Sequence, residues 1–321
     1  MSEKIDISVI VPVYNEVESI TELTNWIGRV MQGHGFSYEV IMVDDGSNDG
    51  SWEKINDLSQ EDKNIKAVRF NRNYGKSAAL NTGFGFASGD VVITMDADMQ
   101  DSPDEIPELY RMVVEHKYDI VSGWKKKRHD PISKTIPSKF FNYVTGKISG
   151  IKLHDFNCGL KAYQNHVVKN IHVYGEMHRY IPVIAKWHGF SNIGEKVVQH
   201  RARKYGTTKY GFQRFITGFL DLASITFVSK FRKKPMHFFG TLGTISFLSG
   251  FGIAVYIILR KIWSLYYHQL ARDVVEQPLF FLSLVAVIVG VQLFLAGFLA
   301  EMYTLQNAKK EDYILIDKIG L

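Results

Sequence analysis

Cysteine is almost absent from this chain of 321 residues, since Cys158 is the only one. A single thiol excludes an intrachain disulfide and suits a reducing compartment. We expect Cys158 to be a small packing residue. We also expect no secretory signal peptide, because the apolar run 7–13 is too short and too strand-like to be one.

Two common nucleotide-binding loops are missing. The first apolar run leads into Pro12 to Glu16, where a dinucleotide-binding chain would carry a G-x-G-x-x-G loop, and no P-loop sequence occurs either. A Q-x-x-R-W motif is absent as well. The first two absences argue against dinucleotide-dependent enzymes and P-loop NTPases.

Charge is missing from two long stretches in the C-terminal third. Segments 238–259 and 278–300 contain 22 and 23 residues without Asp, Glu, Lys or Arg. At 1.5 Å rise per residue, each is long enough to cross a hydrocarbon core of about 30 Å. Buried core helices are the alternative, but runs of this length favour membrane spans. We therefore predict a multi-pass protein of the cell inner (plasma) membrane with a large non-membrane domain.

Basic residues are concentrated beside the first apolar stretch. Segment 201–234 contains nine Lys or Arg and one Asp. Cations on this flank favour its retention in the cytoplasm, so the N-terminal domain and both termini are predicted to be cytoplasmic. This cluster and another at 125–139 either contact anionic lipid or bind substrate phosphates, and both roles can hold. Nucleic acid is not an expected partner, because the clusters adjoin membrane segments.

Strand-like and helix-like segments alternate over the first 125 residues. Strands are predicted at 7–13, 38–43, 65–70, 91–95 and 119–122. Helices are predicted at 17–31, 49–59 and 76–87, and from Pro103 onward. This alternation predicts an α/β fold with a mostly parallel sheet covered by helices on both faces. Later segments predict helices at 133–149 and 179–188 and strands at 160–163 and 193–198.

Segment 212–227 repeats apolar residues at helical spacing, with Arg214 and Lys230 beside the apolar face. The pattern favours a helix in the membrane interface that includes Phe215, with an ordinary core helix as the alternative. The predicted organisation is a domain over 1–205, a juxtamembrane amphipathic and basic segment over 206–235, a two-helix transmembrane domain over 236–303 and a cytoplasmic tail over 304–321.

Asp96 and Asp98 follow the fourth predicted strand, at the sheet edge where open α/β folds bind ligands. Alternation along a straight strand would point both carboxylates to the same side. Two such oxygen ligands can hold Mg²⁺ or Mn²⁺. A haloacid-type phosphatase would use the same motif, but after its first strand.

Three motifs occur in order along the chain, at Val9 to Glu16, Val43 to Gly50 and Met95 to Asp101. They resemble the signatures of inverting family-2 glycosyltransferases with the Rossmann-like GT-A fold. Residues Arg203 to Tyr210 resemble the basic motif of the branch that acts on polyprenyl phosphates, which includes dolichyl-phosphate mannose synthases. The two apolar C-terminal segments resemble the bacterial undecaprenyl-phosphate glucosyltransferases most closely.

The resemblance implies roles for named residues, although any single one of the pocket residues could be plain turn chemistry. The nucleotide-sugar pocket would be lined by Pro12, Tyr14, Glu16, Asp44, Asp45 and Asp96. The divalent ion, Mg²⁺ or Mn²⁺, would be held by Asp96, Asp98 and Gln100. Donor and acceptor phosphates would be bound by Arg128, Arg201, Arg203 and Lys209. The catalytic residues would be Asp98, Asp155 and Arg128, with Asp155 either orienting the acceptor side or a sugar hydroxyl, or capping its loop.

The implied reaction is inverting transfer of one hexose from a nucleotide sugar, with UDP-glucose the leading donor, to a polyprenyl (undecaprenyl) phosphate. The second pKa of such a phosphate lies near 6, so the acceptor is largely ionised at neutral pH and needs no strong base. The missing Q-x-x-R-W motif favours one transfer over polymerisation. GDP-mannose is the alternative donor, and a catalytically silent membrane scaffold is the alternative of another class. A homo-oligomer is left open.

Overall fold

The computed structural model describes residues 4–126, 132–201, 235–268, 270 and 272–307. The chain divides into two units, Met1–Ser224 and Ile225–Leu321. The predicted juxtamembrane segment 206–235, including the helix 212–227 with Phe215, lies outside the described residues apart from its last position, and so does the predicted tail from residue 308 onward.

A seven-stranded sheet forms the centre of the first unit, and its strands run in the spatial order β3-β2-β1-β4-β6-β5-β7. The strands are β1 (Ile7–Val13), β2 (Tyr38–Asp44), β3 (Ile65–Arg69), β4 (Val91–Thr94), β5 (Ile120–Trp124), β6 (Lys161–Gln164) and β7 (Ile193–Val197). Strand β6 is antiparallel to both of its neighbours, and the other neighbouring pairs are parallel. The predicted mostly parallel α/β sheet is thus confirmed.

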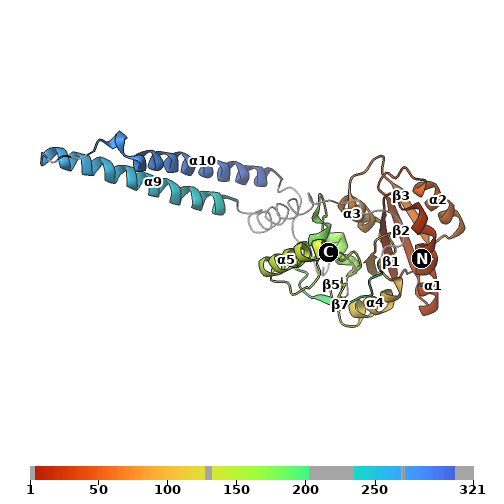
Figure 1. Cartoon of the computed structure of the whole chain (residues 1–321). Helices are drawn as coiled ribbons and strands as arrows, with labels where there is room; N and C mark the ends of the chain where they lie inside the picture. Colours follow the sequence, from red (N-terminus) through yellow and green to blue (C-terminus); the bar gives the residue numbers. More distant parts are fainter. Residues whose placement is uncertain (1–3, 127–131, 202–234, 269, 271, 308–321) are drawn as a thin grey trace, which may run out of the picture. The chain divides into compact units, whose positions relative to one another are not determined.

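Helices cover both faces of this sheet (Figure 1). Apolar residues of α1 (Val17–His34), α2 (Ser51–Glu61) and α4 (Ile106–Val114) share one core with Val9 and Val11 of β1. Ile10 points to the opposite face, as strand alternation requires. There it meets α3 (Lys76–Phe86), because a Cβ on Gly83 would lie 2.5 Å from Ile10 Cγ2.

The second half of this unit adds α5 (Ile132–Ser149), α6 (Asn165–Asn170), a 3₁₀ turn η2 (Met177–Tyr180) and α7 (Ile181–Trp187). The predicted helix 179–188 is therefore split into two elements. Pro182 lies in the first turn of α7, where its missing N–H costs nothing. The 3₁₀ turn η1 (Pro103–Glu105) likewise precedes α4.

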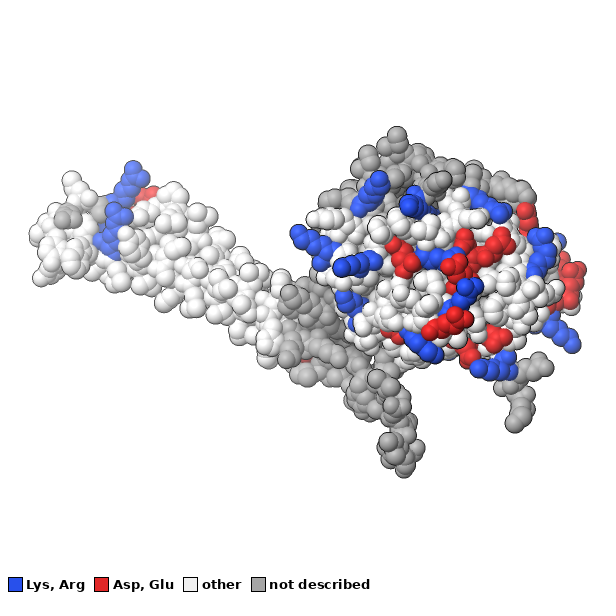
Figure 2. Space-filling view, turned by 90° about the horizontal axis from the view of Figure 1, so that it is seen from below, with Lys and Arg blue, Asp and Glu red and all other residues white. Residues whose placement is uncertain are grey.

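Two long antiparallel helices make up most of the second unit, α9 (Pro235–Tyr266) and α10 (Pro278–Asn307), with the short 3₁₀ turn η3 (Val274–Glu276) between them. Both are long and apolar enough to cross a membrane, and only 17% and 11% of their most apolar windows are buried. The face in Figure 2 shows hardly any charge along these helices except near one end. A buried core helix would not leave this apolar surface exposed, so membrane spans are favoured.

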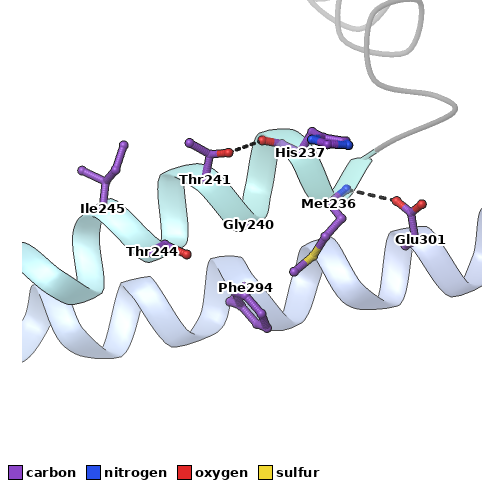
Figure 3. A pocket seen from close by; sticks show the side chains of 8 residues that line it. All are labelled: Met236, His237, Gly240, Thr241, Thr244, Ile245, Phe294 and Glu301. Carbon is purple, nitrogen blue, oxygen red and sulfur yellow. Dashed lines mark hydrogen bonds between the residues drawn. The ribbon is translucent and has the colours of Figure 1, made fainter.

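Glycines allow α9 and α10 to approach closely. A Cβ on Gly243 would lie 2.7 Å from the carbonyl oxygen of Gly290, and one on Gly250 would lie 2.6 Å from that of Ser283. In lipid no hydrophobic effect drives helices together, so the close packing that small residues allow is what stabilises such a contact. Near the start of α9, the Glu301 carboxylate accepts from the Met236 N–H at 3.2 Å, and both residues line a pocket between the helices (Figure 3).

Candidate active site

The strand order changes direction between β1 and β4. The chain runs outward from β1 through β2 to β3 and then returns to place β4 on the other side of β1. Ligands of open α/β sheets bind where the order reverses in this way. Three loops meet at this edge, following Val13, Asp44 and Thr94.

The loop after β1 is fastened to the loop after β2. Asn15 adopts a positive φ of 53°, its N–H donates to Ser47 Oγ at 2.9 Å, and its Oδ1 accepts from the Asn48 N–H at 2.9 Å. The Glu16 N–H donates to Ser51 Oγ at 3.0 Å. Tyr14, in contrast, keeps 37% of its surface exposed. Pro12 and Glu16 are partly buried beside it.

Asp44 and Asp45 are adjacent but have different environments. Asp44 is fully buried, lies 3.2 Å from Arg69 Nε through Oδ2 and accepts from the Ser47 N–H through Oδ1. Asp45 reaches the next loop and accepts from the N–H groups of Tyr74 at 2.7 Å and Gly75 at 2.9 Å. Burial raises the pKa of the Asp45 carboxyl, although the two N–H donors oppose that shift.

The two aspartates after β4 are oriented by a turn. Strand β4 ends at Thr94, one residue earlier than predicted, and Met99 has a positive φ of 60°. Asp96 and Asp98 lie in this turn beyond the strand, so the alternation of a straight strand does not apply to them. Asp98 is 8% exposed, and its Oδ1 accepts from the Gln100 N–H at 3.2 Å, which closes the turn.

Asp96 forms an ion pair with Lys76, the first residue of α3. Burial alone would raise the pKa of the Asp96 carboxyl, but Lys76 lowers it to about 2, with smaller contributions from Lys125 and His178. Asp96 is therefore ionised throughout the physiological range. Gly159 packs against it, since a Cβ there would lie 2.5 Å from Asp96 Oδ2. The Gly159 carbonyl is held by Thr94 Oγ1 at 2.8 Å.

Asp155 lies in the same loop as Gly159 and is 1% exposed. Its Oδ1 accepts from the Asn157 N–H at 3.0 Å, so it does cap its own turn. Glu195 of β7 holds this loop, because its Oε1 accepts from the backbone N–H groups of His154 and Asp155, at 2.8 and 3.0 Å. Its Oε2 lies 2.7 Å from His154 Nδ1.

The predicted phosphate-binding cations are only partly described. Arg201 begins the basic segment: its N–H donates to the Gln100 carbonyl at 3.0 Å, and its guanidinium lies 4.2 Å from the centre of the Trp26 ring. The structure thus brings Arg201 to the Asp98–Gln100 turn, with an indole beneath its charge. Arg128, Arg203 and Lys209 lie outside the described residues.

Comparisons with known proteins agree with this geometry. A family model described as "Glycosyl transferase family 2" matches residues 8–172. The chain belongs to this family. The transferase is also 35% identical over 303 residues to dodecaprenyl-phosphate galacturonate synthase of Rhizobium johnstonii, and the match covers 94% of this chain and 88% of that one.

Solved structures establish the fold. Glucosyl-3-phosphoglycerate synthase from Mycobacterium tuberculosis in complex with UDP superposes with a TM-score of 0.53 at 18% identity, over 68% of this chain and 80% of that chain. The same enzyme with Mn²⁺ and UDP-glucose gives 0.53 at 18% identity, over 70% and 78%. The catalytic unit of the transferase therefore has the GT-A fold.

The motifs did not single out three lysines at the site. Lys125 lies 2.7 Å from the buried carboxylate of Asp101, which raises the pKa of the Lys125 ammonium despite its burial. Lys161 is buried beneath the loop, donates to the Cys158 carbonyl and has a pKa lowered by burial. Burial raises the pKa of the Cys158 thiol to about 12, so the thiol is neutral.

Lys76 is the third of these residues, and the sequence did contain a signal for it. A cation in the first turn of a helix opposes the positive end of the helix dipole. Lys76 is the first residue of α3, where an acidic or small polar residue would be favourable.

Proposed function

We propose that this transferase moves a single hexose, with inversion, from a nucleotide sugar to a polyprenyl phosphate at the cytoplasmic membrane face. The supporting observation is the 35% identity to a dodecaprenyl-phosphate galacturonate synthase, which extends over 94% of the chain. Such a match includes the hairpin of apolar helices as well as the catalytic unit. A lipid acceptor also accounts for the two exposed apolar helices, because they would anchor the enzyme in the membrane that contains its acceptor.

The nucleotide sugar would bind at the carboxyl ends of β1 and β4. Tyr14 offers a partly exposed aromatic face for the base, and Glu16 lies beside it. Both adjacent aspartates are buried, and we favour Asp45 for the nucleoside contact because it is 4% exposed and reaches the loop before Lys76. Asp44 is fully buried against Arg69, so its contribution would be to shape the loop.

Asp96 and Asp98, with Gln100 as a further ligand, would hold Mg²⁺ or Mn²⁺ on the donor diphosphate. The residues fit such an ion. Asp96 is ionised, and the missing side chain of Gly159 leaves room for its carboxylate. Mg²⁺ is typically bound by one or two carboxylates together with substrate phosphates, and Asp96 and Asp98 offer two carboxylates.

When bound, the ion would supply Lewis-acid neutralisation of the departing diphosphate. The chain's own residues would bring two anions together and orient them. Arg201, with Arg128, Arg203 and Lys209, would bind the phosphates, and Asp155 would orient the acceptor side through the loop that Glu195 fixes. No strong base is required, because a phosphate with a second pKa near 6 is largely ionised at neutral pH.

UDP-glucose is our first choice of donor, and a galacturonate donor is the second because of the named relative. Purified protein in detergent is incubated with undecaprenyl phosphate, Mg²⁺ and each of radiolabelled UDP-glucose, UDP-galacturonate and GDP-mannose. We expect label in the organic phase with UDP-glucose. Label only from UDP-galacturonate or GDP-mannose would overturn the glucose assignment and leave the lipid acceptor standing.

A further inference from the structure

Lys76 has no role in the reaction proposed above, although its side chain lies at the proposed metal site. It pairs with Asp96, the carboxylate that would also bind the divalent ion. The two side chains keep 28% and 32% of their surface exposed, so the pair is accessible from solvent. A cation that arrives with the donor must compete with this ammonium for the same carboxylate.

The backbone before Lys76 is held in place by Asp45, which belongs to the proposed nucleoside site. Asp45 accepts from the N–H groups of Tyr74 and Gly75, the two residues that precede Lys76. Gly75 has a φ of 93°, which turns the chain into α3 at this point. A contact to Asp45 by the bound nucleoside would therefore be adjacent to the residue whose side chain neutralises Asp96.

The position of Lys76 does not stabilise α3 itself. The ammonium lies at the N-terminus of α3, where the helix dipole repels cations and attracts anions. An anion such as a diphosphate at this point would be stabilised by both the helix terminus and the lysine.

We propose that Lys76 is an exchangeable counter-charge for the donor site. In the donor-free enzyme its ammonium neutralises Asp96, and when the metal–nucleoside diphosphate complex binds, Asp96 passes to the metal while the ammonium passes to a diphosphate oxygen. The exchange keeps each charge paired at both stages, so the Asp96 carboxylate is compensated both without and with the donor. This inference rests on the proposed metal and nucleotide-sugar sites.

The test measures Mn²⁺ binding and UDP binding separately, on the full chain in detergent. Mn²⁺ affinity without nucleotide is measured by electron paramagnetic resonance, and UDP affinity at saturating Mn²⁺ by calorimetry. For Lys76→Met we expect Mn²⁺ to bind on the order of fivefold more tightly, because a partly exposed competing ion pair is lost. We expect UDP to bind about tenfold or more weakly, because a charge-assisted hydrogen bond is lost.

Two further variants keep the outcome interpretable. Lys76→Arg retains the charge and should not tighten Mn²⁺ binding. Lys4→Gln removes a cation from an exposed pair with Asp90, 2.9 Å apart at the opposite end of β4, and should change neither affinity. Lys76→Gln repeats the neutral substitution if the methionine variant does not fold.

An exchange requires that Lys76→Met changes the affinities for Mn²⁺ and for UDP in opposite directions. Weaker binding of both ligands by Lys76→Met would mean a purely structural lysine, and unchanged UDP binding would mean a lysine that stays on Asp96; either result overturns the inference. Either of these two results would leave the proposed function standing, provided that the wild-type enzyme binds Mn²⁺ and transfers sugar. A wild-type protein that binds neither Mn²⁺ nor UDP would overturn both.

Discussion

Gly159→Ala tests whether the position of the Asp96 carboxylate controls activity. A Cβ at residue 159 would lie 2.5 Å from Asp96 Oδ2 and 2.6 Å from Cγ, so the carboxylate or the loop must move. A normal contact needs a shift of about 1 Å, and a misplacement of that size at a reacting group can cost about 100-fold. We therefore expect kcat/KM for the nucleotide sugar to fall by about 100-fold.

The stability of the same variant should change much less than its activity. Overpacking of one methyl group costs about 1–3 kcal/mol, equivalent to a fall in Tm of roughly 2–10 °C for a unit of this size. Transfer of labelled sugar into lipid gives kcat/KM, and thermal unfolding of the same preparation gives Tm.

Gly85→Ala is the matched control, because this glycine also belongs to the catalytic unit and a Cβ there would meet nothing within 4 Å. It should leave kcat/KM unchanged and leave Tm unchanged or slightly raised, since alanine favours a helix. If Gly159→Ala kept the wild-type kcat/KM, the carboxylate of Asp96 would not be a critical part of the site.

Three other predictions concern single residues. Glu195→Gln removes the charge paired with His154 and should lower kcat/KM for the lipid phosphate about tenfold, with the donor KM within twofold; a raised donor KM would contradict the acceptor-side role of Asp155. Lys76 depresses the folded-state pKa of Asp96 to about 2, below an unfolded value near 4. The ion pair therefore stabilises the folded protein above about pH 4, and this stabilisation is lost as the pH falls through about 2. The Tm of Lys76→Met should therefore lie below that of the wild type at pH 6, and the difference should shrink toward pH 2; a difference that is constant with pH would refute this linkage. Phe215→Ala should reduce turnover on membrane-bound lipid more than UDP affinity, whereas equal losses would indicate a packing role.

Much of the fold could be predicted because the central strands are buried on both faces. Continuous apolar runs such as Ile7–Val13 are typical of parallel strands covered by helices, and they were correctly placed. The reversed direction of β6 was not predicted, because a four-residue strand carries no signal of its direction. The split of the helix at 179–188 depended on Pro182 and was not anticipated either.

The site was predictable as a set of loops and not as a set of contacts. The motifs correctly located the ends of β1, β2 and β4, where Tyr14, Asp45 and Asp96 lie. Neighbouring carboxylates in one turn cannot be distinguished from sequence, and only the structure shows that Asp44 turns inward to Arg69. The Lys76–Asp96 pair joins residues 20 positions apart, and it depends on how α3 meets the sheet.

The most direct test of the central claim is the mass of the lipid product. Purified protein is incubated with undecaprenyl phosphate, UDP-glucose and Mg²⁺, and the extracted lipid is analysed beside a reaction with Asp98→Asn. We predict undecaprenyl phosphate carrying one hexose, formed in equal amount to the UDP released, and almost none with Asp98→Asn. Unmodified lipid, both here and in parallel reactions with UDP-galacturonate and GDP-mannose, would contradict the proposed reaction. A ladder of several sugars, or equal product from Asp98→Asn, would contradict it as well.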